Sequence, residues 1–138
     1  MRRFAVLFAL AAVVSCGGDS PTSPSATVSG TYSLQTVNGV KLPYTYPQDV
    51  YDKFEFLSDV RTLSDSGTFT ETYTNRQTQS GVATTFSRTV TGTYTVVGGG
   101  ISFFHPEGNE SGSVGAGKLT LRSPADGIVA AVYQKEGS

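Results

Sequence analysis

Few side chains in this chain of 138 residues could carry out catalytic chemistry. There is one Cys, one His and no Trp, so an internal disulfide and a zinc site built from several thiolates are both excluded. No Ser stands in a Gly-x-Ser-x-Gly turn, and His105 has no Asp at a spacing that the local sequence would pair with it. Glu107 and Glu110 follow His105, but their spacing matches no calcium-binding loop. We therefore expect a protein that is not an enzyme, with no catalytic residue, no metal and no cofactor.

Two charged residues, Glu71 and Arg88, are the best candidates for ligand recognition. Each occurs in a run of alternating residues, on the same side as aromatic residues. Buried charges are tolerated when they are paired, and an inward-facing Arg88 would hold the carboxylate or phosphate of an amphiphile. The alternatives are that both charges lie in water near the mouth of the fold, or that they only neutralise each other. The ligand-binding residues that we predict are Arg88, Glu71, Tyr73, Tyr94 and Phe86.

These residues lie in two neighbouring β-strands that alternation predicts. Over residues 83–97, aromatic or apolar residues and one Arg occupy one side, while Thr and Ser occupy the other. This pattern is typical of a strand with one buried face. A two-residue turn at Ser80 and Gly81 would place Gln79 opposite Val82, so the aromatic faces of the two strands would coincide. The two rows of Thr would coincide as well, and we interpret them as an ordinary solvent-exposed ladder rather than an ice-binding or sugar-binding surface.

The rest of the chain also indicates short strands separated by turns. Asn38 followed by Gly39 is the strongest hairpin signal, and Tyr32 and Leu34 of the strand before it are expected to face inward. Residues 42–52 are irregular and rich in Pro and Tyr. We expect them to form a flap with its rings turned inward; the alternative is an exposed aromatic contact surface. The other expected strands cover residues 28–37, 54–63, 101–105, 118–122 and 127–134.

These segments predict an all-β domain of seven to eight antiparallel strands. A straight strand over residues 83–97 would be about 50 Å long, which exceeds the width of a domain of this size. The strand must therefore bend, and Gly92, which has no side chain on the inward face, is the natural point. A curled up-and-down meander closes most simply as a small barrel; the alternative is a two-sheet β-sandwich.

The domain resembles small lipocalin-like lipoproteins of bacteria. The resemblance rests on Gly30-Thr31-Tyr32 in the first strand, on the Asn38-Gly39 turn, on the hairpin entry Ser66-Gly67-Thr68-Phe69, and on the meander itself. It implies an eight-stranded lipocalin-like barrel with room for an apolar cavity.

The N-terminus has the plan of a secretory signal peptide. Arg2 and Arg3 precede an eleven-residue apolar run over residues 4–14, which is shorter than the roughly 20 residues of a membrane-spanning helix. Val13-Val14-Ser15-Cys16 resembles the lipobox of bacterial lipoproteins, which implies cleavage after residue 15 and a diacylglycerol and an acyl chain such as palmitate on Cys16. Two or more chains give stable membrane anchoring. We therefore expect a signal peptide at residues 1–15, the lipidated Cys16 and a flexible tether at 16–27, and the β-barrel domain at 28–136.

Charge leaves two classes of function open. The formal net charge is −1, and loss of the signal peptide removes two basic residues, so no basic surface suggests nucleic acid as a partner. Membrane contact would then be made by the lipid, and the protein would reside in the cell envelope, on the periplasmic side or the cell surface. Either the barrel binds a small apolar or amphiphilic ligand, or it is a solid scaffold that contacts another envelope protein through residues 43–51 and 104–117.

Overall fold

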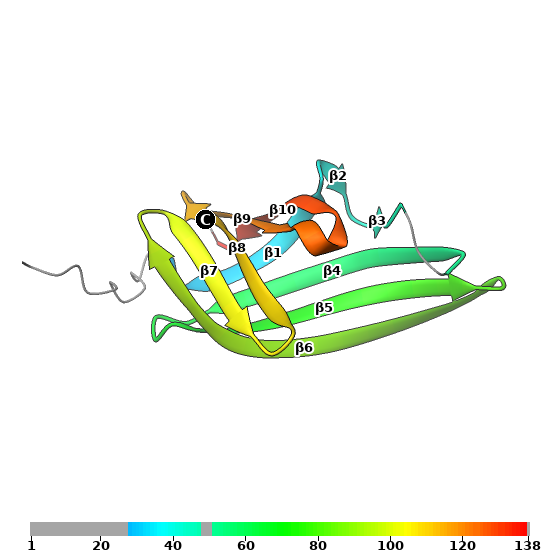
Figure 1. Cartoon of the computed structure of the whole chain (residues 1–138), viewed down its shortest axis with the longest axis horizontal. Coiled ribbons are helices and arrows are strands. Elements are labelled where there is room, and N and C mark those ends of the chain that lie inside the picture. The colour runs from blue at the N-terminus through cyan, green and yellow to red at the C-terminus, as the bar shows by residue number, and fades with distance from the viewer. Residues whose placement is uncertain (1–27, 48–50, 138) are drawn as a thin grey trace, which may run out of the picture.

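The protein, as a computed structural model, is described over residues 28–47 and 51–137. It is all-β apart from one 3-10 turn, η1, at Pro124–Asp126 (Figure 1). The predicted signal peptide, Cys16 and the tether lie outside the described residues. The strands in chain order are β1 (Gly30–Val37), β2 (Val40–Lys41), β3 (Tyr44–Thr45), β4 (Lys53–Leu63), β5 (Thr68–Gln79), β6 (Val82–Val97), β7 (Gly100–His105), β8 (Gly108–Gly115), β9 (Lys118–Ser123) and β10 (Ile128–Lys135).

Eight of these strands close into an antiparallel barrel. Sequential neighbours pair from β4 to β10, β10 pairs with β1, and β1 returns to pair with β4 through Gly30↔Leu63 to Ser33↔Val60. The short strands β2 and β3 are additions at its margin. The predicted small all-β barrel is therefore confirmed, and the two-sheet sandwich is not the architecture.

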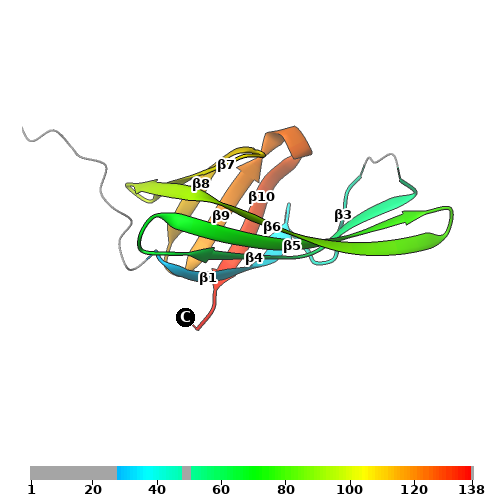
Figure 2. The same ribbon diagram turned by 90° about the horizontal axis from the view of Figure 1, so that it is seen from below.

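Three strands continue beyond one end of the barrel. Figures 1 and 2 show β4, β5 and β6 running past β7 to β10, and β7 pairs with β6 only from Thr93 onward. We call the projecting part, residues 53–57, 74–79 and 82–87, the arm. Within residues 28–47 and 51–137, the part of β6 before Thr93 pairs with β5 alone, and every residue from Val82 to Thr89 is exposed. The arm extends the wall of the barrel on one side of its mouth.

The β5–β6 hairpin has the predicted register. Ser80 and Gly81 have φ angles of 51° and 77°, as a two-residue type I′ turn requires, and Gln79 pairs with Val82. The Thr rows coincide on the exposed face, where Thr72 and Thr89 hydroxyls are 3.1 Å apart. Alternation and turn chemistry therefore predicted the pairing of these two long strands.

A β-bulge in β4 changes which residues face the interior. Phe56 pairs with Asn75, but the next pair is Ser58 with Thr74, so Leu57 is an extra residue. Even-numbered residues face inward before the bulge, and odd-numbered residues face inward after it. The bulge therefore turns Asp59 and Arg61 into the barrel, where an unbroken alternation continued from Phe56 would have placed them on the outer face.

Residues 104–117, one of the two contact surfaces suggested for a scaffold, do not form a loop. Most of them belong to β8, which is a full strand of the barrel wall between β7 and β9. Gly112 shows why small residues are needed there: a Cβ atom at this position would lie 1.9 Å from the Thr120 carbonyl oxygen. The composition of β8 reflects close approach of two strands rather than a loop.

Gly92 allows the same close approach in β6. A Cβ atom there would lie 2.2 Å from the Phe104 carbonyl oxygen and 2.7 Å from the Phe69 ring. Figure 1 shows β6 curving as it passes from the arm into the barrel. The prediction that this long strand bends is confirmed.

Candidate functional site

The main cavity opens inside the barrel at the end from which the arm projects. Its volume is about 490 Å³, which lies in the range of small-molecule sites. Asp59, Arg61 and Glu71 line it, and so do Tyr73 and Asn75. The other half of the barrel is filled by packed side chains such as Tyr32, Tyr94, Phe103 and Leu119. The interior is therefore solid toward one end and hollow toward the other.

A buried ion cluster forms the floor of this cavity. The Arg61 guanidinium contacts Glu71 through Nη2 at 2.7 Å and Glu110 through Nη1 at 2.6 Å, and its Nε lies 3.7 Å from Asp59 Oδ2. Tyr133 donates a hydrogen bond of 2.6 Å to the same Asp59 oxygen. The residues come from β4, β5, β8 and β10, so only closure of the barrel brings them together.

Aromatic rings surround the Arg61 guanidinium. Its central carbon lies 5.1 Å from the centroid of Phe103, 5.5 Å from that of Tyr133 and 6.0 Å from that of Phe69. Cation–π attraction of this kind is strongest for desolvated cations. The rings therefore help to hold the buried charge in one place.

Burial changes the proton affinity of the carboxyl groups. Desolvation is the main cause that raises the pKa of Glu71, to about 8, against the opposing attraction of Arg61. Burial also raises the pKa of Asp59. Asp59 and Glu71 also repel each other and share a hydrogen bond, which raises the pKa of Glu71 further. Burial and this neighbouring charge therefore favour a proton on the Asp59–Glu71 pair.

Several buried polar atoms in the cluster have no hydrogen-bond partner. They are Asp59 Oδ1, Arg61 Nε, Asn75 Oδ1 and both ring nitrogens of His105. His105 Nε2 lies 3.8 Å from Glu110 Oε2, beyond hydrogen-bond distance. Buried polar groups are rarely left unsatisfied, so these atoms mark a place where a bound molecule would gain interactions.

Aromatic side chains form the mouth of the cavity. The Tyr46 and Phe56 rings meet edge to face at 6.5 Å, and Phe56 stacks on Tyr73 at 6.2 Å. All three line the cavity. Tyr44 is 9% exposed and contacts Tyr46 at 5.5 Å, so these two rings of segment 42–52 turn inward, as expected. Tyr51 instead stacks on Phe54 of the arm at 5.9 Å. An apolar group would pass between the rings of the mouth to reach the ion cluster.

The structure separates the five predicted ligand-binding residues. Glu71 and Tyr73 line the cavity. Tyr94 is 2% exposed and donates a hydrogen bond to the Ser64 carbonyl oxygen, outside the cavity wall. Phe86 lies on the arm, where it is 39% exposed and contacts Phe54 at 6.2 Å.

The expected pairing of Glu71 with Arg88 is wrong. Arg88 is opposite Tyr73, its side chain is 59% exposed, and it pairs with Glu107. Glu71 is opposite Arg61 instead, and Arg61 is the buried cation. One feature of the sequence does indicate that Arg61 faces inward. Asp59 and Arg61 are separated from Leu63 by even numbers of positions, so they share its face of the strand, and Leu63 is an apolar residue expected in the core.

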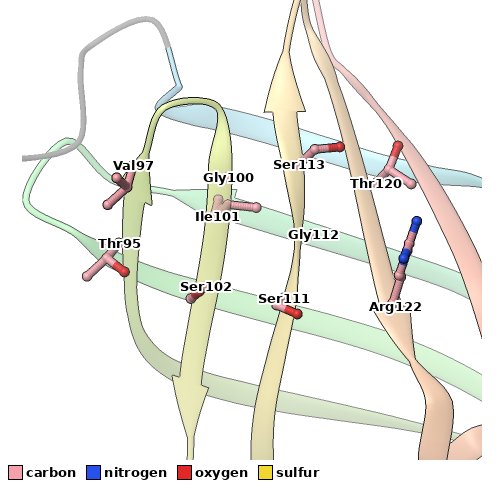
Figure 3. Close-up of a pocket in the computed structure, with 10 residues that line it drawn as sticks. All are labelled: Thr95, Val97, Gly100, Ile101, Ser102, Ser111, Gly112, Ser113, Thr120 and Arg122. Atoms are coloured by element: carbon pink, nitrogen blue, oxygen red, sulfur yellow. The ribbon is translucent and has the colours of Figure 1, made fainter.

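A second hollow lies on the outside of the barrel. It has a volume of about 440 Å³ and runs across β6 to β9, as Figure 3 shows. The strand register aligns Thr95, Ser102, Ser111 and Arg122 in one row. The hollow is lined by hydroxyl groups that already face water, and no unpartnered buried atom is found there. We therefore regard the interior cavity as the candidate site.

Two further observations concern the part of the chain that the structure describes. Within residues 28–47 and 51–137, no helix has the length and apolar character needed to cross a membrane. Over the same residues, no three acidic, His or Cys side chains are grouped as a metal site would require. Comparison with protein-family models, curated proteins and solved structures finds no match to this chain.

Proposed function

We propose that the chain is an exported lipoprotein, anchored to a cell-envelope membrane through lipid on Cys16, whose lipocalin-like barrel binds a small amphiphilic ligand. The observation that carries the proposal is the cavity of about 490 Å³ with aromatic rings at its mouth and a buried polar cluster at its floor. Such a pairing of apolar walls with a few convergent polar groups is the usual form of a small-molecule site.

The anchor is supported by the order of elements at the N-terminus. Two Arg, an apolar run and a small residue before Cys16 precede a segment rich in Gly, Ser, Pro and Thr, which suits a tether. The barrel would then be held near the bilayer but free to turn. Labelling of cells with radioactive palmitate tests this part: the wild-type chain should become labelled, whereas Cys16→Ala should not. An unlabelled wild-type chain would contradict the anchor.

Native mass spectrometry tests ligand binding. The full-length protein, extracted from a bacterial envelope, should carry a reproducible added mass of a few hundred daltons, within the size that such a cavity accommodates. Ala131 is buried and lines the cavity, so Ala131→Leu should lower the fraction of the protein that carries the added mass. Ala130→Leu, on the opposite face of β10, is the matched control. A bare wild-type mass from several extracts would contradict the ligand-binding proposal.

The second candidate is a scaffold that contacts another envelope protein, and one observation favours it. The arm exposes apolar side chains, with Val82 67% and Phe86 39% exposed, along an edge of β6 that pairs with no strand among the described residues. Exposed edges of this kind are ready to pair with another chain. Cross-linking in intact cells from position 84 should then capture one protein reproducibly, and Val82→Lys should abolish the product.

A further inference from the structure

The charge balance of the ion cluster indicates what kind of ligand it takes. Three carboxyl groups, those of Asp59, Glu71 and Glu110, surround a single cation, Arg61. His105 is the other titratable group near Glu110, and Tyr133 adds a hydroxyl. The floor of the cavity therefore has more negative than positive groups, which disfavours an anionic ligand.

Arg61 has few hydrogen-bond donors available for an anionic ligand. Both of its terminal nitrogens contact carboxyl oxygens, those of Glu110 at 2.6 Å and Glu71 at 2.7 Å. Its Nε has no hydrogen bond but lies 3.7 Å from Asp59 Oδ2. A carboxylate or phosphate would have to displace a buried carboxyl group from the guanidinium, and breaking a buried ion pair is strongly unfavourable.

The unpartnered oxygens point to a donor. Asn75 Oδ1 has no hydrogen-bond partner, and Asn75 is 7% exposed. Asp59 is 2% exposed, and its only partner for Oδ1 is the proton that it shares with Glu71. Both line the cavity, and both oxygens accept hydrogen bonds. An ammonium group brings a positive charge and three donors, so it satisfies the charge and the acceptors together.

The rings at the mouth suit the rest of such a molecule. Tyr46, Phe56 and Tyr73 line the way to the cluster and present ring faces and edges to an apolar or aromatic group. Ring stacking and, for the cation itself, cation–π attraction both favour this arrangement.

We propose that the barrel binds a protonated amine on an aromatic or apolar body, with the ammonium held by Asp59, Glu71 and Asn75 and the body between the rings of the mouth. This proposal rests on the proposed function as a ligand-binding barrel and names its ligand class. The proton that Glu71 retains in the empty cavity is the positive charge that the ammonium replaces.

Three indole compounds test the proposal: tryptamine, which is a cation, tryptophol, which is neutral, and indole-3-propionate, which is an anion. The chain has no Trp, so indole emission, excited where Tyr does not absorb, reports the probe alone. The full-length protein is titrated with each compound at pH 7. We expect tryptamine to bind at least about tenfold more tightly than tryptophol, the factor that about 1.4 kcal/mol produces, and indole-3-propionate to bind most weakly.

Variants then locate the ammonium. Asp59→Asn and Glu71→Gln keep the side-chain shapes but remove the negative charge that each group would present to the ammonium in the complex. Each should weaken tryptamine about tenfold while leaving tryptophol within about twofold. Asn75→Leu removes an unpartnered acceptor and should lower the tryptamine preference without lowering stability. Asp65→Asn, in the exposed β4–β5 turn, is the control and should change neither affinity.

The outcomes separate this proposal from the proposed function. Equal binding of the three compounds, or a preference for indole-3-propionate, overturns the amine proposal but supports a ligand-binding barrel. A tryptamine preference that survives in both Asp59→Asn and Glu71→Gln also overturns it, since the cation would then be held elsewhere. Failure of all three compounds to bind, together with a bare mass in native mass spectrometry, overturns both.

Discussion

Substitution of Glu71 by Gln should change how stability depends on pH. Burial raises the pKa of Glu71 from 4.5 to about 8, so between these values the folded chain holds a proton that the unfolded chain has released. The stabilisation that this proton contributes is therefore fully present below about pH 4.5 and is lost as pH rises to about 8. Gln keeps the shape and an acceptor for Arg61 but does not titrate, so the variant should lose this slope.

The size of the effect follows from the shift. One proton contributes about 1.4 kcal/mol per pH unit, so the free energy of unfolding should fall by at most about 5 kcal/mol across this window, and by less where Asp59 shares the proton. Asp59 acts in the same direction, because burial also raises its pKa. Glu55 acts in the opposite direction, but outside the window: hydrogen bonds from Arg76 and Lys53 lower its pKa to about 2.

Urea denaturation followed by circular dichroism, at unit steps from pH 5 to pH 9, measures the slope. Glu71→Gln should become progressively more stable relative to wild type as pH rises, with an unchanged dependence on urea concentration. Glu136→Gln is the control, because Glu136 is exposed and accepts a hydrogen bond only from Ser33 among the side-chain contacts described; it should follow wild type. A wild-type chain whose stability rises from pH 5 to pH 8, or a variant with the wild-type slope, would refute the reasoning.

Three further measurements probe the cavity and the barrel wall. Arg61→Met should lower the free energy of unfolding by about 3 kcal/mol or more, since it leaves buried carboxyl groups without their cation. Arg88→Met, at an exposed pair, should lower it by less than about 1 kcal/mol. Equal losses in urea titrations would contradict the assignment of Arg61 as the buried cation. Gly112→Ala should destabilise the barrel by about 1 to 3 kcal/mol or more, as overpacking does, because the added Cβ meets the β9 backbone at 1.9 Å. Gly115→Ala, with nothing within 4 Å of the added Cβ, should not; the midpoint of thermal unfolding compares the two variants. Tryptamine binding at pH 6 should release close to one proton from the carboxyl cluster and at pH 9 almost none, which calorimetry in buffers of different ionisation enthalpy measures; an uptake of protons at pH 6 would rule out replacement of the bound proton.

Local patterns were sufficient to predict the central hairpin. Strict alternation assigns the two faces of β5 and β6, and Ser80 and Gly81 provide the turn that sets their register. Asn38 and Gly39 likewise form the predicted turn, with φ angles of 51° and 81°. These features depend on residues close together in the chain, so the sequence carries them directly.

The sequence also determined the class of fold and the inward direction of Glu71 and Tyr73, because period-two order over many residues permits only a half-buried strand. The tertiary structure alone decided the partner of Glu71. A single extra residue at Leu57 turns Arg61 inward, and a bulge of this kind is set by pairing across strands rather than by composition. Glu110 contacts Arg61 across 49 positions of chain, and β8 is recognisable as a strand only once its neighbours are in place. Closure of the barrel assembles the cavity, and closure depends on contacts between distant strands that no local pattern encodes.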